Sequence, residues 1–131
     1  MLARTDLIKI ARGKLKDAAV LCTNRRYDGA SYICGYAVEL TLKARICKTL
    51  KWKGYPESNS EFSDYQSFRT HKLDVLLYLT GREEFIKTNY MVEWSGVNEW
   101  ESKSRYNMTG SVTKEDTQLM IASAEILLKK I

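Results

Sequence analysis

The sequence predicts an all-α fold, an antiparallel up-and-down bundle of about five helices that forms a single domain over residues 1–131. Three observations support this prediction. The chain contains only one proline, Pro56, so long helices meet few breakers. Apolar residues recur at spacings of three and four, which is the period of an α-helix. A chain of 131 residues is also long enough to bury one sizeable core.

The longest helical pattern, Tyr27–Leu50, is expected to form the centre of the bundle. Asp28 is its expected N-cap, because the carboxylate can accept hydrogen bonds from the free amides of the first turn. Several inward-facing residues are small, which lets a second backbone come close. The inward face consists of Ala30, Ile33, Cys34, Ala37, Leu40, Ala44 and Cys47.

One helix is expected before the central one, over Thr5–Thr23, with Thr5 as its N-cap. The short polar turn Asn24–Arg26 would connect the two as antiparallel neighbours. A loop over Gly54–Ser60 follows the central helix, and Glu61–Ser67 fits either a loop or a helical turn.

Two shorter helices are expected next, over Phe68–Thr80 and Arg82–Trp94. Gly81 between them suits the left-handed conformation that often ends a helix. The second helix could continue to Trp100, although Gly96 is expected to interrupt it.

The segment Glu101–Val112 has no helical stripe and is expected to be a loop, long enough to have a functional role. The last helix is expected to begin after Thr113, which forms a near capping box with Asp116. Its predicted apolar side consists of Leu119, Met120, Ala122, Ala124, Ile126, Leu127 and Ile131.

Cysteine and histidine usage argues against a metal centre. Cys22, Cys34 and Cys47 are odd in number, lack Cys-x-x-Cys spacing and are interpreted as small core residues. His71 is the only histidine, which excludes a multi-histidine site within one chain, so no metal or cofactor is expected.

The apolar runs are too short to cross a bilayer, and the first ten residues are too charged for a signal peptide. A cytoplasmic location and no membrane partner are therefore expected.

Positive charge is concentrated in the first part of the chain. Residues 1–53 contain twelve Lys and Arg against four acidic residues, whereas residues 54–131 contain nine against twelve. This asymmetry suggests an anionic partner for the first two helices. The alternative is that these cations simply solvate the outer faces of the helices.

The run Tyr27–Lys43, with its Ala-Val-Glu-Leu-x-Leu-Lys core, follows a Lys-Leu-Lys-Asp-Ala helix and precedes Thr70–Asp74. This arrangement resembles the HEPN domain, named for higher eukaryotes and prokaryotes nucleotide-binding, over most of the chain. Trp100 and Arg105-Tyr106 add to the resemblance. It implies a five-helix bundle, often a homodimer, that handles nucleotides or RNA. Many members are ribonucleases or toxins in antiphage and toxin–antitoxin systems, and others are accessory domains paired with a minimal nucleotidyltransferase.

The ribonuclease branch of that family carries an Arg followed, after four to six residues, by a His. This chain lacks the motif: Arg69 is separated from His71 by one residue, and Asn89 stands where Arg82 would require a histidine. Asn cannot transfer protons as an imidazole can. The leading hypothesis is therefore a small binding or accessory module for a nucleotide, an RNA or a partner nucleotidyltransferase. The alternatives are a divergent ribonuclease or toxin that uses His71, Arg69 and Glu39, and a purely structural interaction protein.

The candidate ligand-binding residues are Glu39, Tyr32, Tyr36, Lys43, His71, Arg105 and Tyr106. Glu39 is expected to be a half-buried carboxylate that faces a ligand cleft walled by Tyr32 and Tyr36. The structural alternative is an exposed pair of Glu39 with Lys43, four residues further along the helix.

His71 is the one candidate catalytic residue, although a hydrogen bond to a loop or to Asp74 is the more ordinary interpretation. The late aromatic residues Tyr90, Trp94, Trp100 and Tyr106 fit core packing or a dimer interface. Base stacking, with Arg105 on a phosphate, is the competing interpretation.

Overall fold

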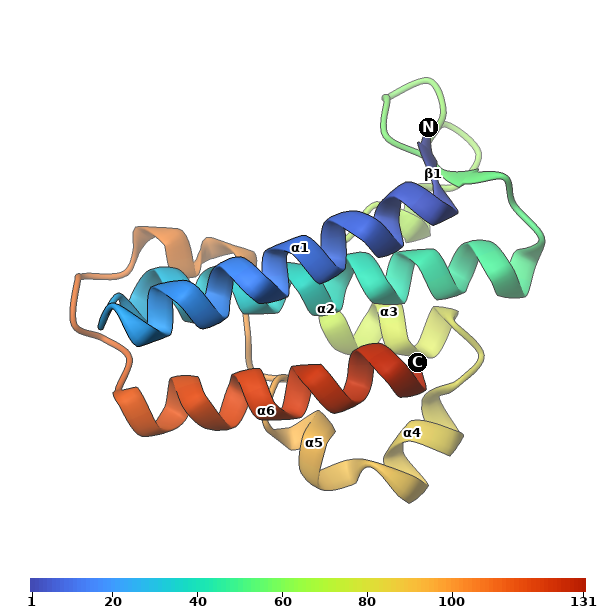
Figure 1. Ribbon diagram of the computed structural model, residues 1–131. Helices are drawn as coiled ribbons and strands as arrows, with labels where there is room; N and C mark the ends of the chain where they lie inside the picture. The colour runs from blue at the N-terminus through green and yellow to red at the C-terminus, as the bar shows by residue number, and fades with distance from the viewer.

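Three long helices lie side by side in the computed structural model, which describes residues 1–131 (Figure 1). They are α1 (Arg4–Thr23), α2 (Tyr27–Leu50) and α6 (Lys114–Lys130). α1 runs antiparallel to α2, whereas α6 runs in the same direction as α2. The predicted all-α bundle is confirmed.

Shorter elements return the chain from the end of α2 to the start of α6, which is why these two helices are parallel. They are α3 (Leu73–Leu79), α4 (Glu83–Asn89), α5 (Met91–Ser95) and the 3₁₀ helices η1 (Gln66–Phe68) and η2 (Ser102–Tyr106). The strands β1 (Leu2–Ala3) and β2 (Gly54–Tyr55) pair antiparallel, so the start of the expected loop after α2 is tied to the N-terminus.

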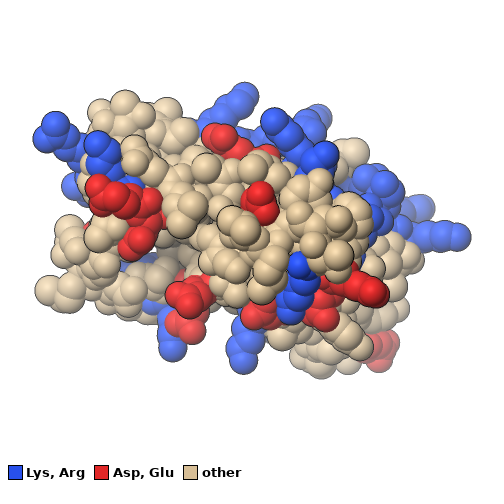
Figure 2. Space-filling model, turned by 90° about the horizontal axis from the view of Figure 1, so that it is seen from below, with Lys and Arg blue, Asp and Glu red and all other residues tan.

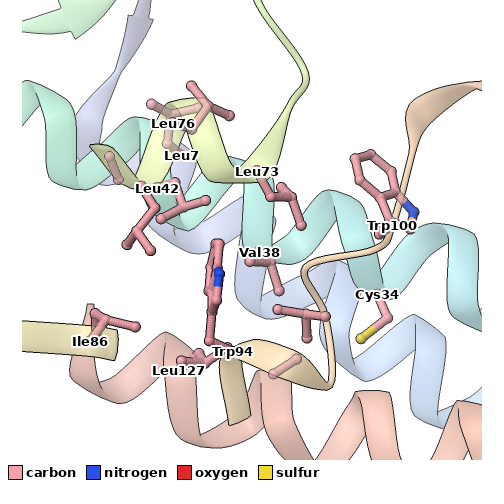
Figure 3. Close-up of a cluster of buried hydrophobic side chains, with 14 of the residues drawn as sticks. Leu7, Cys34, Val38, Leu42, Leu73, Leu76, Ile86, Trp94, Trp100 and Leu127 are labelled. Atoms are coloured by element: carbon pink, nitrogen blue, oxygen red, sulfur yellow. The ribbon is translucent and has the colours of Figure 1, made fainter. Parts of the chain in front are cut away.

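α2 is the centre of the core, as the sequence predicts, and packs against α1, α3 and α6. Figure 3 shows the indole of Trp94 reaching from α5 towards Val38 and Leu42 of α2. Its Nε1 donates to a carboxylate oxygen of Asp74, 3.0 Å away, so this buried polar group is satisfied. Each fully buried large apolar side chain contributes roughly 1.5–3 kcal/mol to folding.

The third helix begins at Leu73 rather than at Phe68, so His71 lies before the helix and not within it. The Thr70 hydroxyl accepts a hydrogen bond from the Lys72 amide at 3.1 Å. Such a local bond competes with helix formation, so His71 lies in an irregular segment.

The fourth helix breaks at Tyr90, earlier than expected, and Trp100 lies outside any helix. The Asn89 side chain donates to the Phe85 carbonyl at 2.9 Å, a local bond that competes with continuation of the helix. Gly96 ends α5 instead of interrupting a longer helix. A side chain there would overlap Ser123 of α6, so glycine permits the close approach of α5 and α6.

Two of the three predicted N-caps are wrong. Asp28 lies inside α2, and its carboxylate accepts from the backbone amides of Gly110 at 2.6 Å and Val112 at 3.0 Å. Thr5 lies inside α1, which has Ala3 at its cap position. Thr113 caps α6 as predicted, accepting from the Asp116 amide at 3.1 Å.

The apolar side of α6 is only partly correct. Met120, Ala124 and Leu127 are buried, whereas Leu119 is 57% exposed and Ile126 and Ala122 are exposed as well. The inward positions between them are filled by Thr117, Ile121 and Ser123. An apolar stripe on α6 is therefore left without a partner in the monomer.

No helix combines the length and the apolar character that crossing a membrane requires. The three cysteines are free, and Cys34 and Cys47 are buried in the core.

Candidate functional site

Glu39 is a buried carboxylate at the centre of the candidate site, with a side chain only 2% exposed. Both oxygens have protein partners: Lys43 Nζ lies 3.1 Å from Oε2, and His71 Nδ1 lies 2.8 Å from Oε1. A buried charge is costly unless it is paired and hydrogen-bonded, and these two partners meet that requirement. We call these three residues the Glu39 cluster.

The cluster brings together one local partner and one distant one. Lys43 is four residues along α2, so helical geometry places it beside Glu39. His71 comes from the segment before α3, thirty-two residues away in the sequence. The irregular backbone from Arg69 to Lys72 brings the imidazole over α2.

Three expectations about this cluster are wrong. Glu39 is neither half-buried nor facing an open cleft, because His71 and Lys43 cover its two oxygens. The predicted pair with Lys43 exists, but it is buried rather than exposed. The ordinary interpretation of His71 also fails, since Asp74 accepts from Trp94 and not from the histidine.

His71 is the member of the cluster that meets solvent, with a side chain 57% exposed. Because Nδ1 is held against Glu39, Nε2 is the nitrogen left for a ligand. When Nδ1 donates to the carboxylate, Nε2 of the neutral ring is a hydrogen-bond acceptor, and in the cationic ring it is a donor.

An aromatic wall stands beside the cluster and consists of Tyr32, Tyr36 and Trp100. The Tyr36 ring centroid lies 6.5 Å from that of His71 and 5.1 Å from those of both Tyr32 and Trp100. A hydrogen bond with Tyr32, followed by burial, raises the pKa of Tyr36 to about 12. Tyr36 therefore keeps its hydroxyl proton at neutral pH and remains able to donate.

Trp100 lies flat enough on α2 that a side chain at Gly35 would overlap its indole. Its Nε1 is buried and has no hydrogen-bond partner in the protein. The sequence pattern did not indicate this position of Trp100 on α2. The one signal that could have placed it is Gly35, a glycine in the middle of a helix, which marks a close approach.

Arg105 and Tyr106 lie in η2 at the edge of the wall, and both are exposed. The Arg105 guanidinium is 4.7 Å from the centre of the Tyr106 ring. The hydroxyls of Tyr106 and then Tyr32 raise the pKa of Arg105, which places its charge next to the wall. Arg69, by contrast, lies over the Phe62 ring at 5.5 Å and makes no ion pair or hydrogen bond with the Glu39 cluster.

Four clefts of about 370 to 590 Å³ indent the surface, and none of them is lined by Glu39, His71 or Tyr36. A cleft of about 440 Å³ includes Tyr32 and Trp100 on its wall, but four acidic residues also line it. That cleft is unfavourable for an anion. The candidate site thus lies outside these clefts, and no group of three or more His, Cys, Asp or Glu is arranged to hold a metal ion.

No protein-family model, no curated protein and no solved structure matches this chain.

Proposed function

We propose that this protein is a HEPN-like binding or accessory module that takes a nucleotide or a single-stranded RNA on the surface formed by His71, Tyr36, Arg105 and Tyr106. One observation carries the proposal: an exposed imidazole is fixed by a buried carboxylate next to aromatic rings and a guanidinium that has no ion-pair partner. The sequence resemblance described above supports the same class of ligand.

Each group in this surface has a part that suits a nucleotide. Arg105 makes no ion pair, and its guanidinium donates to the Ser102 carbonyl at 3.4 Å, so its charge has no counter-charge and can pair with a phosphate. Tyr106 is 77% exposed and presents a ring on which a base can stack. Nε2 of His71 and the hydroxyl of Tyr36 supply hydrogen bonds to a base edge or a ribose hydroxyl. Glu39 acts as a positioning residue, since its oxygens are already occupied.

Fluorescence anisotropy with a labelled single-stranded RNA, and with a labelled adenine nucleotide, tests the proposal. Arg105→Gln should weaken binding by about tenfold or more, because a charge-assisted hydrogen bond is lost. Lys103→Gln is the matched control, since Lys103 lies in the same 3₁₀ helix and is 77% exposed. Binding through phosphates should also fall steeply as salt increases. Equal affinities for the two variants would remove the phosphate role of Arg105.

A divergent ribonuclease or toxin is the second candidate. It is favoured by the 2.8 Å contact between His71 and Glu39, because a carboxylate that orients an imidazole is a general-base arrangement. Arg69 is not part of this arrangement, so the catalytic set would reduce to His71 with Glu39 behind it. Expression toxicity, or RNA cleavage in vitro, that His71→Gln abolishes would support the enzyme. Expression without toxicity, together with intact RNA binding, would support the binding or accessory module. Such a module could act in a toxin–antitoxin or antiphage system or elsewhere.

The exposed apolar stripe on α6 supports a protein partner. The proposed partner is a second copy of this chain, and the alternative is a nucleotidyltransferase subunit. Multi-angle light scattering of the purified protein should give the mass of a homodimer, and Leu119→Glu should convert it to a monomer. A monomer that co-purifies with a co-expressed nucleotidyltransferase would support the alternative.

A further inference from the structure

A second cleft, of about 380 Å³, lies at the end of the bundle where α1 begins and α2 and α6 end. Its wall contains Arg4, Arg45 and Arg82, together with four more cations and no acidic residue. Figure 2 shows Lys and Arg side chains crowded at the corresponding right-hand end of the molecule. We call this feature the arginine cleft.

No acidic side chain neutralises the charges in the arginine cleft. None of its seven cations takes part in any of the ion pairs of the molecule. The Nε atoms of Arg4, Arg45 and Arg82 are all buried and have no hydrogen-bond partner. Burial lowers the pKa of Arg45, and the nearby charges of Arg82 and Arg4 lower it further.

A structural role explains part of this arrangement. Arg82 donates to the Lys130 carbonyl at 2.9 Å, and Arg45 donates to the Ile131 carbonyl at 3.4 Å. Both arginines thus satisfy the carboxyl end of α6, where cations are favoured. The side chain of Arg4 makes no such bond, and all three Nε groups remain unused. The end of α6 therefore does not account for the third arginine.

We infer that the arginine cleft binds a doubly charged phosphate group, either inorganic phosphate or the phosphomonoester end of a small molecule. A tetrahedral dianion offers several acceptor oxygens to planar guanidinium groups that converge on it. It also neutralises more of the accumulated charge than a phosphodiester of RNA, which carries a single charge. This site goes beyond the function proposed above: Arg45 lies six residues from Glu39 on α2, on a different side of the helix.

Isothermal titration with inorganic phosphate, at an ionic strength kept constant with chloride, tests the inference, and thermal unfolding gives a second readout. Arg4→Gln is the decisive variant, because Arg4 makes no side-chain hydrogen bond or ion pair whose loss would disturb the fold. Arg26→Gln is the matched control: it removes the same charge at the exposed α1–α2 turn, at the opposite end of the bundle. His71→Gln is the control that checks whether phosphate binds at the Glu39 cluster instead of the arginine cleft.

The parent protein should show saturable phosphate binding and a rise in Tm. Arg4→Gln should weaken that binding by about tenfold or more, through loss of a charge-assisted hydrogen bond, and should not unfold at a lower temperature without phosphate. Arg26→Gln and His71→Gln should bind phosphate with the affinity of the parent protein. The parent protein should bind glycerol 3-phosphate and should not bind a dinucleoside phosphodiester.

Four results would overturn the inference. The first two are no saturable binding and equal weakening in Arg4→Gln and Arg26→Gln. The third is tighter binding of the phosphodiester than of inorganic phosphate, which would make the cleft an RNA-backbone contact. The fourth is loss of binding in His71→Gln alone, which would assign the phosphate to the surface around the Glu39 cluster.

Discussion

At the scale of single residues, Glu39 is the side chain whose burial needs the most compensation from its neighbours. It is the one acidic residue in the buried class, and two cationic or titratable side chains are arranged around it. Removing the charge of Glu39 leaves Lys43, whose side chain is only 14% exposed, without its counter-charge, so the cost exceeds the value of a single contact. The cluster thus links the packing of α2 to the position of His71.

Glu39→Gln should lower the free energy of unfolding by about 1–3 kcal/mol, because Lys43 loses its counter-charge in a buried position. Urea denaturation measures the change. Glu83→Gln is the control, since Glu83 forms the same type of i,i+4 pair, with Lys87, on the surface. Surface pairs of this kind contribute only a few tenths of a kcal/mol. Similar losses in the two variants would mean that burial adds nothing to the Glu39 pair.

At the scale of elements, glycines decide how closely the pieces pack. Gly35 on α2 gives Trp100 its place, and Gly96 lets the end of α5 reach α6. Glycine in a helix interior costs about 0.5–1 kcal/mol relative to alanine. At Gly35 and Gly96 this cost is offset by close packing. Gly13 lies on the exposed side of α1, and no atom is near the position that an added side chain would take.

Gly35→Ala should therefore destabilise the protein by about 1–3 kcal/mol, because the indole of Trp100 must move. Gly13→Ala should do the opposite and stabilise it by about 0.5–1 kcal/mol. Thermal unfolding followed by tryptophan fluorescence, to which Trp52, Trp94 and Trp100 all contribute, measures the stability of both variants. A stabilising Gly35→Ala would show that the indole does not rest on α2.

Asp28 connects α2 to the segment that precedes α6. It accepts from the amides of Gly110 and Val112, so it positions the chain just after Arg105 and Tyr106. Asp28→Ala should leave α2 intact and loosen this segment. Limited trypsin digestion should then cleave after Lys103 or Arg105 several-fold faster, because the open form is more populated. Asp17→Ala, an exposed change on α1, should leave the cleavage rate unchanged.

At the scale of the whole molecule, burial of weak acids makes stability depend on alkaline pH. Burial raises the pKa of the Cys34 thiol from 9.0 to about 12, and a hydrogen bond with Tyr32, followed by burial, raises the pKa of Tyr36 to about 12. Between the unfolded and folded pKa values, the folded protein holds more protons than the unfolded chain. The free energy of unfolding therefore falls as pH rises from about 9 to about 12, by up to about 1.4 kcal/mol per pH unit for one group.

Urea denaturation at about pH 8 and about pH 10.5 checks this dependence. Cys34→Ala should reduce the loss of stability between the two pH values, since it removes one of the raised groups. Val38→Ala, in the same core, should lower stability by a similar amount at both pH values. An unchanged pH dependence in Cys34→Ala would mean that the thiol ionises as readily in the folded protein as in the unfolded chain.

Local pattern was enough to predict several features correctly. The period of apolar residues predicted α2 and its role as the central helix, and Thr113 with Asp116 predicted the start of α6. The contact between Glu39 and Lys43 followed from their spacing of four residues. All of these depend on neighbours within one or two turns, where helical geometry fixes the distances.

The sequence by itself determined that the chain forms a helical bundle around Tyr27–Leu50, because periodicity and the scarcity of breakers act locally. Only the tertiary structure decided which groups face one another. His71 contacts Glu39, Trp100 packs on Gly35, and Arg4, Arg45 and Arg82 line one cleft. Each of these arrangements brings together residues that are distant in the sequence. Such contacts depend on how the elements pack, and no local spacing encodes that packing.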